Sequence, residues 1–200
     1  MGKLAGRADD PPRPDREGTL LGLSPSGFHR ITYVDWGPAD DERPIICVHG
    51  VTRQGRDFDY LAAKLAASGR RVICPDLPGR GRSGRIGDPD GYSLPQYCSD
   101  MNALIARLGV REVDWVGSSL GGLIGMVMAG FSGSIVRKLV INDIGPYVSS
   151  TGLRRIGTIS PRCRPCSPRL LMARNTFAKC WRRTASCQNR LIALPTSMYV

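Results

Sequence analysis

The sequence has 200 residues, of which 42% are hydrophobic, enough for one globular domain with a core and too few for two ordinary domains. The net charge of +11 would suit a nucleic-acid binder, but the excess is confined to one part of the chain. Residues 1–143 carry 18 basic and 17 acidic residues, whereas residues 144–200 carry 10 basic residues and no acidic one. We therefore expect no specific nucleic-acid partner for the folded part.

The N-terminal 18 residues are rich in proline and charge and lack the apolar run of a secretory signal, which predicts a disordered arm. The longest apolar stretch, residues 120–131, contains four glycines and is shorter than the roughly 20 residues of a bilayer span. No membrane contact is expected. Cys47, Cys74 and Cys98 are isolated in the sequence and are interpreted as buried thiols of a reducing compartment, so we expect a cytoplasmic protein.

From residue 19 the pattern predicts alternating strands and helices. Residues 19–23 and 28–34 flank a Ser-Pro-Ser-Gly turn and predict an opening hairpin. Short runs of strand-forming residues follow at 44–48, 71–74, 113–116 and 137–142. Helical spacing of apolar residues predicts helices over 58–69, 93–109 and 120–131, the second capped by Ser93 and Gly109. This order predicts an α/β fold with an open, mostly parallel sheet covered on both faces.

A G-x-S-x-G motif, Gly117-Ser118-Ser119-Leu120-Gly121, lies directly between a predicted buried strand and a helix rich in small residues. In this setting the serine occupies a sharp strand-to-helix turn that exposes its hydroxyl, and the helix N-terminus favours an oxyanion. The amide of Leu120 is then a natural oxyanion donor. Outside that context the motif is an ordinary Gly/Ser loop.

His49-Gly50-Val51-Thr52 follows an earlier strand and belongs at the same edge of the sheet. The amide of Val51 can supply a second oxyanion donor, and one such donor typically contributes roughly 3 kcal/mol to the transition state. His49, Gly50 and Arg53 are therefore candidate binding residues. Arg53 and Arg56 hint at an anionic substrate group, although a solvated or structural role is the favoured interpretation of both.

Four motifs in series resemble the α/β-hydrolase superfamily, in particular its enol-lactonase-like and esterase-like members. They are His49-Gly50-Val51-Thr52-Arg53, Asp76-Leu77-Pro78-Gly79-Arg80-Gly81-Arg82-Ser83, the Ser119 motif and Asn142-Asp143-Ile144-Gly145-Pro146. The resemblance implies a serine hydrolase acting on an ester, lactone or related acyl bond of a small molecule. It also implies a nucleophile at Ser119, oxyanion amides at Val51 and Leu120, and no metal or organic cofactor. The sequence is silent on the oligomeric state and on the exact substrate.

The catalytic triad of such hydrolases runs Ser, then Asp or Glu, then His along the chain. After Ser119 this chain has one acid, Asp143, and no histidine. Asp143 is a possible triad acid, with a structural role for its segment as the alternative. His29 and His49 lie upstream, and His49 is expected to anchor the oxyanion loop rather than to act as the base. The chain as written is therefore expected to be nearly inactive.

The partial hydrolase domain is assigned to residues 19–157, and residues 158–200 form a basic tail rich in Cys, Arg and Pro that is predicted to be disordered. A frameshifted or truncated product accounts for the simultaneous loss of acids and periodicity. The alternatives are a zinc site from Cys163, Cys166, Cys180 and Cys187, or a basic nucleic-acid arm on a non-catalytic remnant. Loss of the later strands would also leave the 137–142 strand as an unprotected sheet edge.

Overall fold

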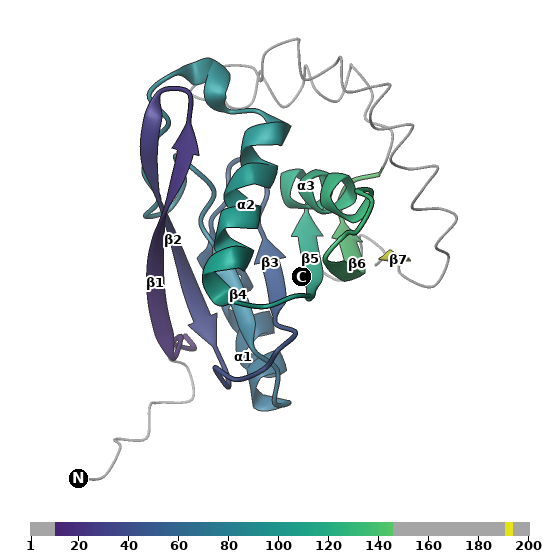
Figure 1. The fold of residues 1–200 in the computed structure, drawn as a ribbon. Coiled ribbons are helices and arrows are strands. Elements are labelled where there is room, and N and C mark those ends of the chain that lie inside the picture. The colour runs from purple at the N-terminus through teal and green to yellow at the C-terminus, as the bar shows by residue number, and fades with distance from the viewer. Residues whose placement is uncertain (1–10, 146–190, 194–200) are drawn as a thin grey trace, which may run out of the picture.

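The computed structural model describes residues 11–145 and, as backbone, residues 191–193. Its centre is a seven-stranded sheet in the order β1-β2-β4-β3-β5-β6-β7 (Figure 1). The strands are β1 (Arg16–Ser24), β2 (Gly27–Trp36), β3 (Ile45–Val48), β4 (Val72–Pro75), β5 (Val113–Ser118), β6 (Val136–Asn142) and β7 (Leu191–Ala193). β1, β2 and β4 pair antiparallel in that order, and the remaining strands pair in parallel. The predicted hairpin and mostly parallel sheet are confirmed.

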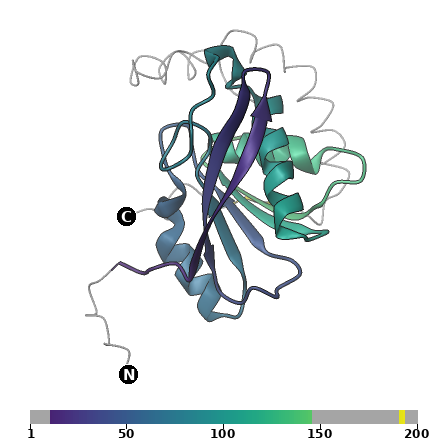
Figure 2. The ribbon, with the colours of Figure 1, turned by 60° about the vertical axis from the view of Figure 1, so that its left-hand side comes forward.

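Helices cover both faces of the sheet. α1 (Asp59–Ala67) lies on one face, and α2 (Leu94–Leu108) and α3 (Leu120–Ala129) lie on the other (Figures 1 and 2). Two short 3₁₀ turns that the sequence pattern did not indicate, Gly55–Phe58 and Pro89–Gly91, precede α1 and α2. Among the described residues, no helix is long and apolar enough to span a bilayer.

Alternation along β3 shows how the sheet supplies two cores. Ile46 and Val48 pack into the larger cluster under α2 and α3, while Ile45 and Cys47 pack into the smaller cluster under α1. Successive side chains of a strand point to opposite faces, so a strand that is apolar at every position is buried on both sides. The expected burial of Cys47, Cys74 and Cys98 is confirmed.

The helix ends follow local chemistry. The Ser93 hydroxyl accepts a hydrogen bond from the Gln96 N–H, 3.4 Å away, and caps α2 as predicted. Gly109 closes the same helix with a φ of 69°, the left-handed conformation that glycine adopts without steric cost. The boundaries of α2 therefore agree with the sequence pattern.

The hairpin and the last strand differ from expectation. β1 begins at Arg16 rather than at residue 19, because the Arg16 guanidinium pairs with Asp35 at 2.9 Å and main-chain pairing continues past the apolar run. At the other edge, β7 pairs in parallel with β6, with Leu191 opposite Leu139. The expectation that β6 would be a bare edge is therefore wrong, and residues 191–193, assigned to a disordered tail, form a strand. The remaining tail residues, including all four of its cysteines, lie outside the described part of the chain.

Candidate active site

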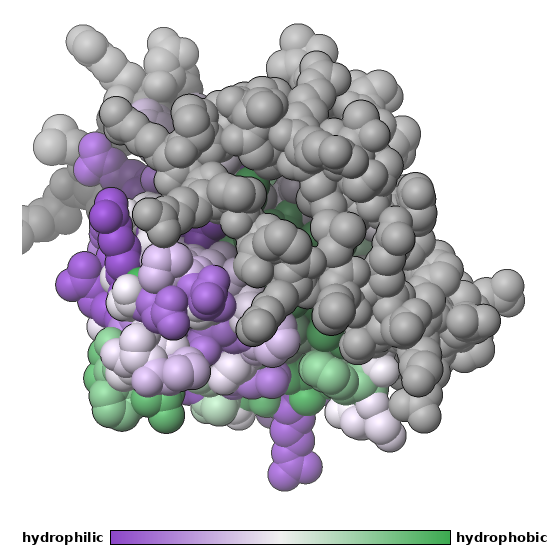
Figure 3. Space-filling view, turned by 90° about the horizontal axis from the view of Figure 1, so that it is seen from above, coloured by the Kyte–Doolittle hydropathy of each residue, from purple (hydrophilic) through white to green (hydrophobic). Residues whose placement is uncertain are grey.

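The parallel strands align their carboxyl ends so that three loops meet at one edge of the sheet. Val48 of β3 is in register with Gly117 of β5, and Ser118 of β5 is in register with Asn142 of β6. The loops that follow these strands begin at the same edge and contain Gly50, Ser119 and Asp143, respectively. The upper side of the molecule in Figure 1 is this edge, and the view from above in Figure 3 shows hydrophilic, intermediate and hydrophobic side chains among the described residues.

Ser119 is the single residue between β5 and α3, and its backbone has a conformation that residues with a side chain rarely adopt. Its φ is 49° and its ψ is −111°, whereas residues other than glycine rarely adopt a positive φ. Two main-chain bonds hold this bend: the Ser119 N–H donates to the carbonyl of Asn142 at 2.9 Å, and the Leu123 N–H donates to the Ser119 carbonyl at 3.1 Å. Strain that the surroundings hold in place is typical of functional sites. The sharp strand-to-helix turn that the motif predicts is present.

Glycines at both ends of the motif allow close backbone approach. A Cβ built on Gly121 would lie 2.0 Å from the Val48 carbonyl oxygen, and one built on Gly117 would lie 2.3 Å from the Gly121 carbonyl oxygen. The Trp115 indole N–H donates to that same Gly121 carbonyl at 3.0 Å. Helix α3 is thereby pressed against β3 and β5, and its first N–H groups, including that of Leu120, lack intrahelical acceptors.

The loop after β3 lies against the serine. A Cβ built on Gly50 would be 3.4 Å from the Ser119 Cβ and 3.8 Å from the Ser118 carbonyl oxygen. The candidate amides of Val51 and Leu120 therefore belong to the two segments that flank the Ser119 backbone. A tetrahedral oxyanion needs two such converging donors.

His49 is almost wholly buried, with 1% relative exposure, and both of its ring nitrogens are occupied. The Leu77 N–H donates to Nε2 at 2.9 Å, so the ring hydrogen belongs on Nδ1, which donates to the Gly50 carbonyl at 2.7 Å. Burial lowers the pKa of His49 below its ordinary value of 6.5. His49 therefore organises the loop after β3, and it has no free nitrogen to take a proton from Ser119.

The remaining candidates have simpler surroundings. Asp143 follows β6, is exposed, and has a φ of 57°. The Nε of Arg53 donates to Asp57 at 2.5 Å, and the Nε of Arg56 donates to Asp59 at 2.6 Å. Within the described part of the chain each arginine thus has a carboxylate partner on its own segment, which favours the structural interpretation of both.

The loop after β4 contains functional candidates to which the sequence pattern gave no role. The Asp76 carboxylate accepts from the Gly55 N–H at 2.8 Å and from the Arg82 N–H at 2.9 Å, joining the loops after β3 and β4. Arg80 donates through Nε to the Val51 carbonyl at 2.8 Å. The Asp76–Ser83 motif was visible in the sequence, but the contacts of its side chains depend on tertiary structure.

Comparison with known proteins agrees with this geometry. The alpha/beta hydrolase fold family matches residues 43–161. A 3-hydroxybutyrate-oligomer hydrolase of Cupriavidus necator is 51% identical over 142 residues, which cover 71% of this chain and 48% of that protein. A non-heme haloperoxidase of Rhodococcus erythropolis is 34% identical over 60% of this chain and 43% of that protein.

Solved structures show the same relationship. An alpha/beta hydrolase from Novosphingobium aromaticivorans superimposes with a TM-score of 0.63 at 37% identity, covering 71% of this chain and 49% of that one. The chain thus spans about half the length of the relatives that it matches. With more than half of its residues matched by the family and a strained serine between β5 and α3, the chain belongs to the alpha/beta hydrolase family.

Proposed function

We propose that this protein is a serine hydrolase of small-molecule acyl bonds in which Ser119 is the nucleophile. The observation that carries the proposal is the positive φ of Ser119 at a bend flanked by Gly50 on one side and the start of α3 on the other. A hydroxyl held at such a bend projects from the backbone toward a substrate rather than into the core. The amides of Val51 and Leu120 are the proposed oxyanion donors.

The proposed reaction consists of two acyl transfers. The Ser119 Oγ attacks the ester carbonyl carbon and passes its proton to a base, and the leaving alcohol takes up a proton as the ester C–O bond breaks. Water then attacks the acyl-serine, releases the carboxylic acid and regenerates the hydroxyl. In both steps the negative charge develops on the carbonyl oxygen, where the two amides stabilise it.

The proposed substrate class is a short ester of a hydroxy acid. Its support is the 51% identity to a protein named for hydrolysing 3-hydroxybutyrate oligomers. That match extends over 142 residues, which are 71% of this chain. Lactones and simple esters are the other members of the class and serve as comparison substrates.

Neither histidine of the sequence is placed to act as the general base for Ser119. The sequence has two histidines: His49 is occupied by Leu77 and Gly50, and His29 is buried with its Nε2 at 3.1 Å from both carboxylate oxygens of Asp100. Neither is available to Ser119. We therefore propose that the chain as written acylates slowly, since losing a triad member typically costs on the order of 10⁴ to 10⁶ in turnover. Asp143 is the candidate acid, because it follows the Asn142 residue that holds the Ser119 N–H.

A fluorophosphonate probe tests the proposal. A reactive serine hydroxyl attacks the phosphorus of the probe, and the oxyanion hole stabilises the negative charge on the phosphonyl oxygen. We expect slow labelling at Ser119, located by peptide mass spectrometry and absent in Ser119→Ala. Ser118→Ala is the matched control: it removes the neighbouring hydroxyl, which accepts from the Asn142 amide at 3.2 Å, and should leave labelling in place. Folded protein that does not label, or equal labelling of Ser119→Ala, would refute the assignment.

A further inference from the structure

We propose that Arg80 is a positioning residue for the oxyanion hole, fixing the main chain of Val51 so that its N–H faces the substrate oxygen. The inference rests on the proposed function, since it assigns an additional residue to the same site. Arg80 belongs to the loop after β4 and lies more than twenty residues from Val51 in the sequence. Its guanidinium nevertheless touches the loop after β3 directly.

Three hydrogen bonds and two aromatic rings hold the Arg80 guanidinium. Nε donates to the Val51 carbonyl at 2.8 Å, and Nη1 donates to the Pro78 carbonyl at 2.8 Å and to the Tyr97 hydroxyl at 2.9 Å. Its carbon lies 5.6 Å from the centre of the Tyr92 ring and 5.8 Å from that of Tyr97, within the range of cation–π attraction. A planar group bonded along its edges and packed on its faces has little freedom to move.

Hydrogen bonds hold the peptide groups on both sides of Val51. The carbonyl of the preceding peptide, that of Gly50, accepts from the His49 Nδ1 at 2.7 Å and from the Arg53 N–H at 3.1 Å. In a trans peptide the C=O and the N–H point in opposite directions, so holding the Gly50 oxygen directs the Val51 N–H the other way. Arg80 holds the following peptide at the Val51 oxygen. With both planes fixed, the two soft dihedrals of Val51 are fixed as well.

The anchor of Arg80 is the start of α2. Tyr97 is a buried residue of α2, and Tyr92 precedes the helix and accepts from the Ile86 N–H at 3.0 Å. A Cβ on Gly79 would lie 2.9 Å from the Tyr92 hydroxyl, so the loop that carries Arg80 is packed against the same ring. The oxyanion loop is therefore coupled through one guanidinium to the helix layer. A lysine ammonium, a point donor without a plane, would reproduce this only in part.

The experiment compares Arg80→Gln and Arg80→Lys with Arg82→Gln. Arg82 is the matched control from the same loop: its side chain is half exposed and pairs with Glu17 instead of the Val51 carbonyl. Two readouts are combined: the fluorophosphonate labelling of Ser119, separated into its saturating rate and its half-saturating concentration, and hydrogen–deuterium exchange of a peptide spanning residues 49–54.

For Arg80→Gln we expect the saturating rate to fall about 10- to 100-fold, the loss associated with a misplaced rather than a deleted donor, with little change in half-saturation. Exchange over residues 49–54 should rise, Arg80→Lys should be intermediate, and Arg82→Gln should match the wild type in both readouts. A purely structural role would instead raise exchange throughout the domain and lower Tm.

Wild-type exchange and labelling in Arg80→Gln would overturn the proposal. If Arg80→Gln does not fold, Arg80→Lys decides, and unchanged exchange and rate in that variant overturn it. If the wild type does not label at all, the hydrolase assignment fails, while the exchange comparison still shows whether Arg80 holds the loop.

Discussion

The main-chain N–H of Ser119 donates to the carbonyl of Asn142 at 2.9 Å, across the two neighbouring strands β5 and β6. This bond holds a residue whose backbone alone would avoid a φ of 49°, a conformation that costs of order 1 to 3 kcal/mol. The bend is thus a product of sheet register rather than of the serine itself. Its surroundings should be correspondingly intolerant of added volume.

Substituting Gly121 by Ala should destabilise the fold by at least about 3 kcal/mol, because the new Cβ would lie 2.0 Å from the Val48 carbonyl oxygen and must force α3 away from β3. Gly133→Ala is the comparison, since Gly133 has a positive φ of 77° but open space around it. Its cost should be limited to about 1 to 2 kcal/mol of backbone strain. Urea denaturation gives both values, and equal losses would show that packing at the bend is looser than these contacts indicate.

Imidazole in solution should accelerate labelling of Ser119. If the site lacks only its base, a free imidazole can accept the serine proton, and a gain of about tenfold at high concentration would recover part of the 10² to 10⁴ that a positioned base provides. The gain should follow the neutral fraction of imidazole as pH is varied and should vanish in Ser119→Ala. A rate independent of imidazole would mean that something other than the base limits the chemistry.

Asp143→Asn should lower the imidazole-assisted rate by about tenfold or more if the carboxylate orients or stabilises the base, as proposed. Asparagine tolerates the left-handed backbone that Asp143 adopts at a φ of 57°, so the stability should not change. Asp143→Gly separates the two roles: it loses the charge but should change the free energy of unfolding by less than about 1 kcal/mol, because Asp tolerates this backbone and glycine adds conformational entropy to the unfolded chain. An unaltered rate in Asp143→Asn would leave Asp143 with a conformational role alone.

Much of this architecture was predictable because it depends on local patterns. A continuous apolar run marked β3, and Ser93 and Gly109 marked the ends of α2, since caps and burial act within a few residues. The bend at Ser119 was predictable because its glycines sit where the backbone needs them. Strand ends were less so, as at Arg16, where pairing to Asp35 extends β1 beyond its apolar residues.

The contacts that position the site were not predictable in the same way. Arg80 meets Val51, and Asp100 meets His29, across long separations in the sequence, and no periodicity records such pairs. The tautomer of His49 likewise depends on the Leu77 amide of another loop. The strand β7 was not predictable either, because an apolar run of three residues in a basic segment is too short to indicate a strand.

In His49→Asn the free energy of unfolding should fall less steeply than in the wild type as the pH drops below 6.5. Burial lowers the pKa of His49, so near pH 6.5 and just below it the unfolded chain binds a proton that the folded chain does not. The free energy of unfolding therefore falls as the pH drops below 6.5, by at most about 1.4 kcal/mol per pH unit from this residue. The asparagine amide can still donate to Gly50 but does not titrate.

The quantity to measure is the difference in unfolding free energy between wild type and His49→Asn from pH 8 to pH 5. It should be constant above pH 7 and shrink below 6.5. Subtraction is needed because burial raises the pKa of Asp100, and that carboxyl stabilises the fold increasingly as the pH falls, with the opposite sign. Curves that stay parallel down to pH 5 would mean that His49 titrates alike in the folded and unfolded chain.

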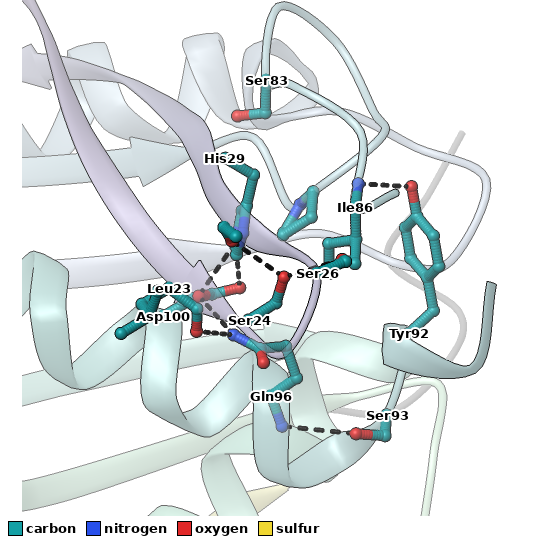
Figure 4. A network of polar contacts seen from close by, with 12 residues as sticks. Leu23, Ser24, Ser26, His29, Ser83, Ile86, Tyr92, Ser93, Gln96 and Asp100 are labelled. Carbon is teal, nitrogen blue, oxygen red and sulfur yellow. Dashed lines mark hydrogen bonds and ion pairs between the residues drawn. The ribbon is translucent and has the colours of Figure 1, made fainter. Parts of the chain in front are cut away.

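A buried polar network attaches the β1–β2 hairpin to α2 (Figure 4). His29 of β2 lies 3.1 Å from both oxygens of Asp100 on α2, and the Gln96 amide donates at 2.9 Å to Asp100 and to the Leu23 carbonyl of β1. The side chains of the His29–Asp100 pair are 1% and 0% exposed. A Cβ on Gly22 would lie 2.5 Å from an Asp100 oxygen, so β1 closes directly over the pair.

Removing one partner of this pair should therefore cost more than removing both. Asp100→Leu leaves the His29 and Gln96 donors buried without their acceptor, and a loss of about 3 kcal/mol is expected. His29→Leu with Asp100→Leu should lose less than the sum of the single changes, with a coupling of about 1 to 3 kcal/mol, because apolar groups replace both polar ones. The same cycle on Glu17 and Arg82, whose side chains are 49% and 48% exposed, should give a much smaller coupling, because water screens an exposed ion pair. Equal coupling in the two cycles would show that water reaches the His29–Asp100 pair and that the hairpin is not held through it.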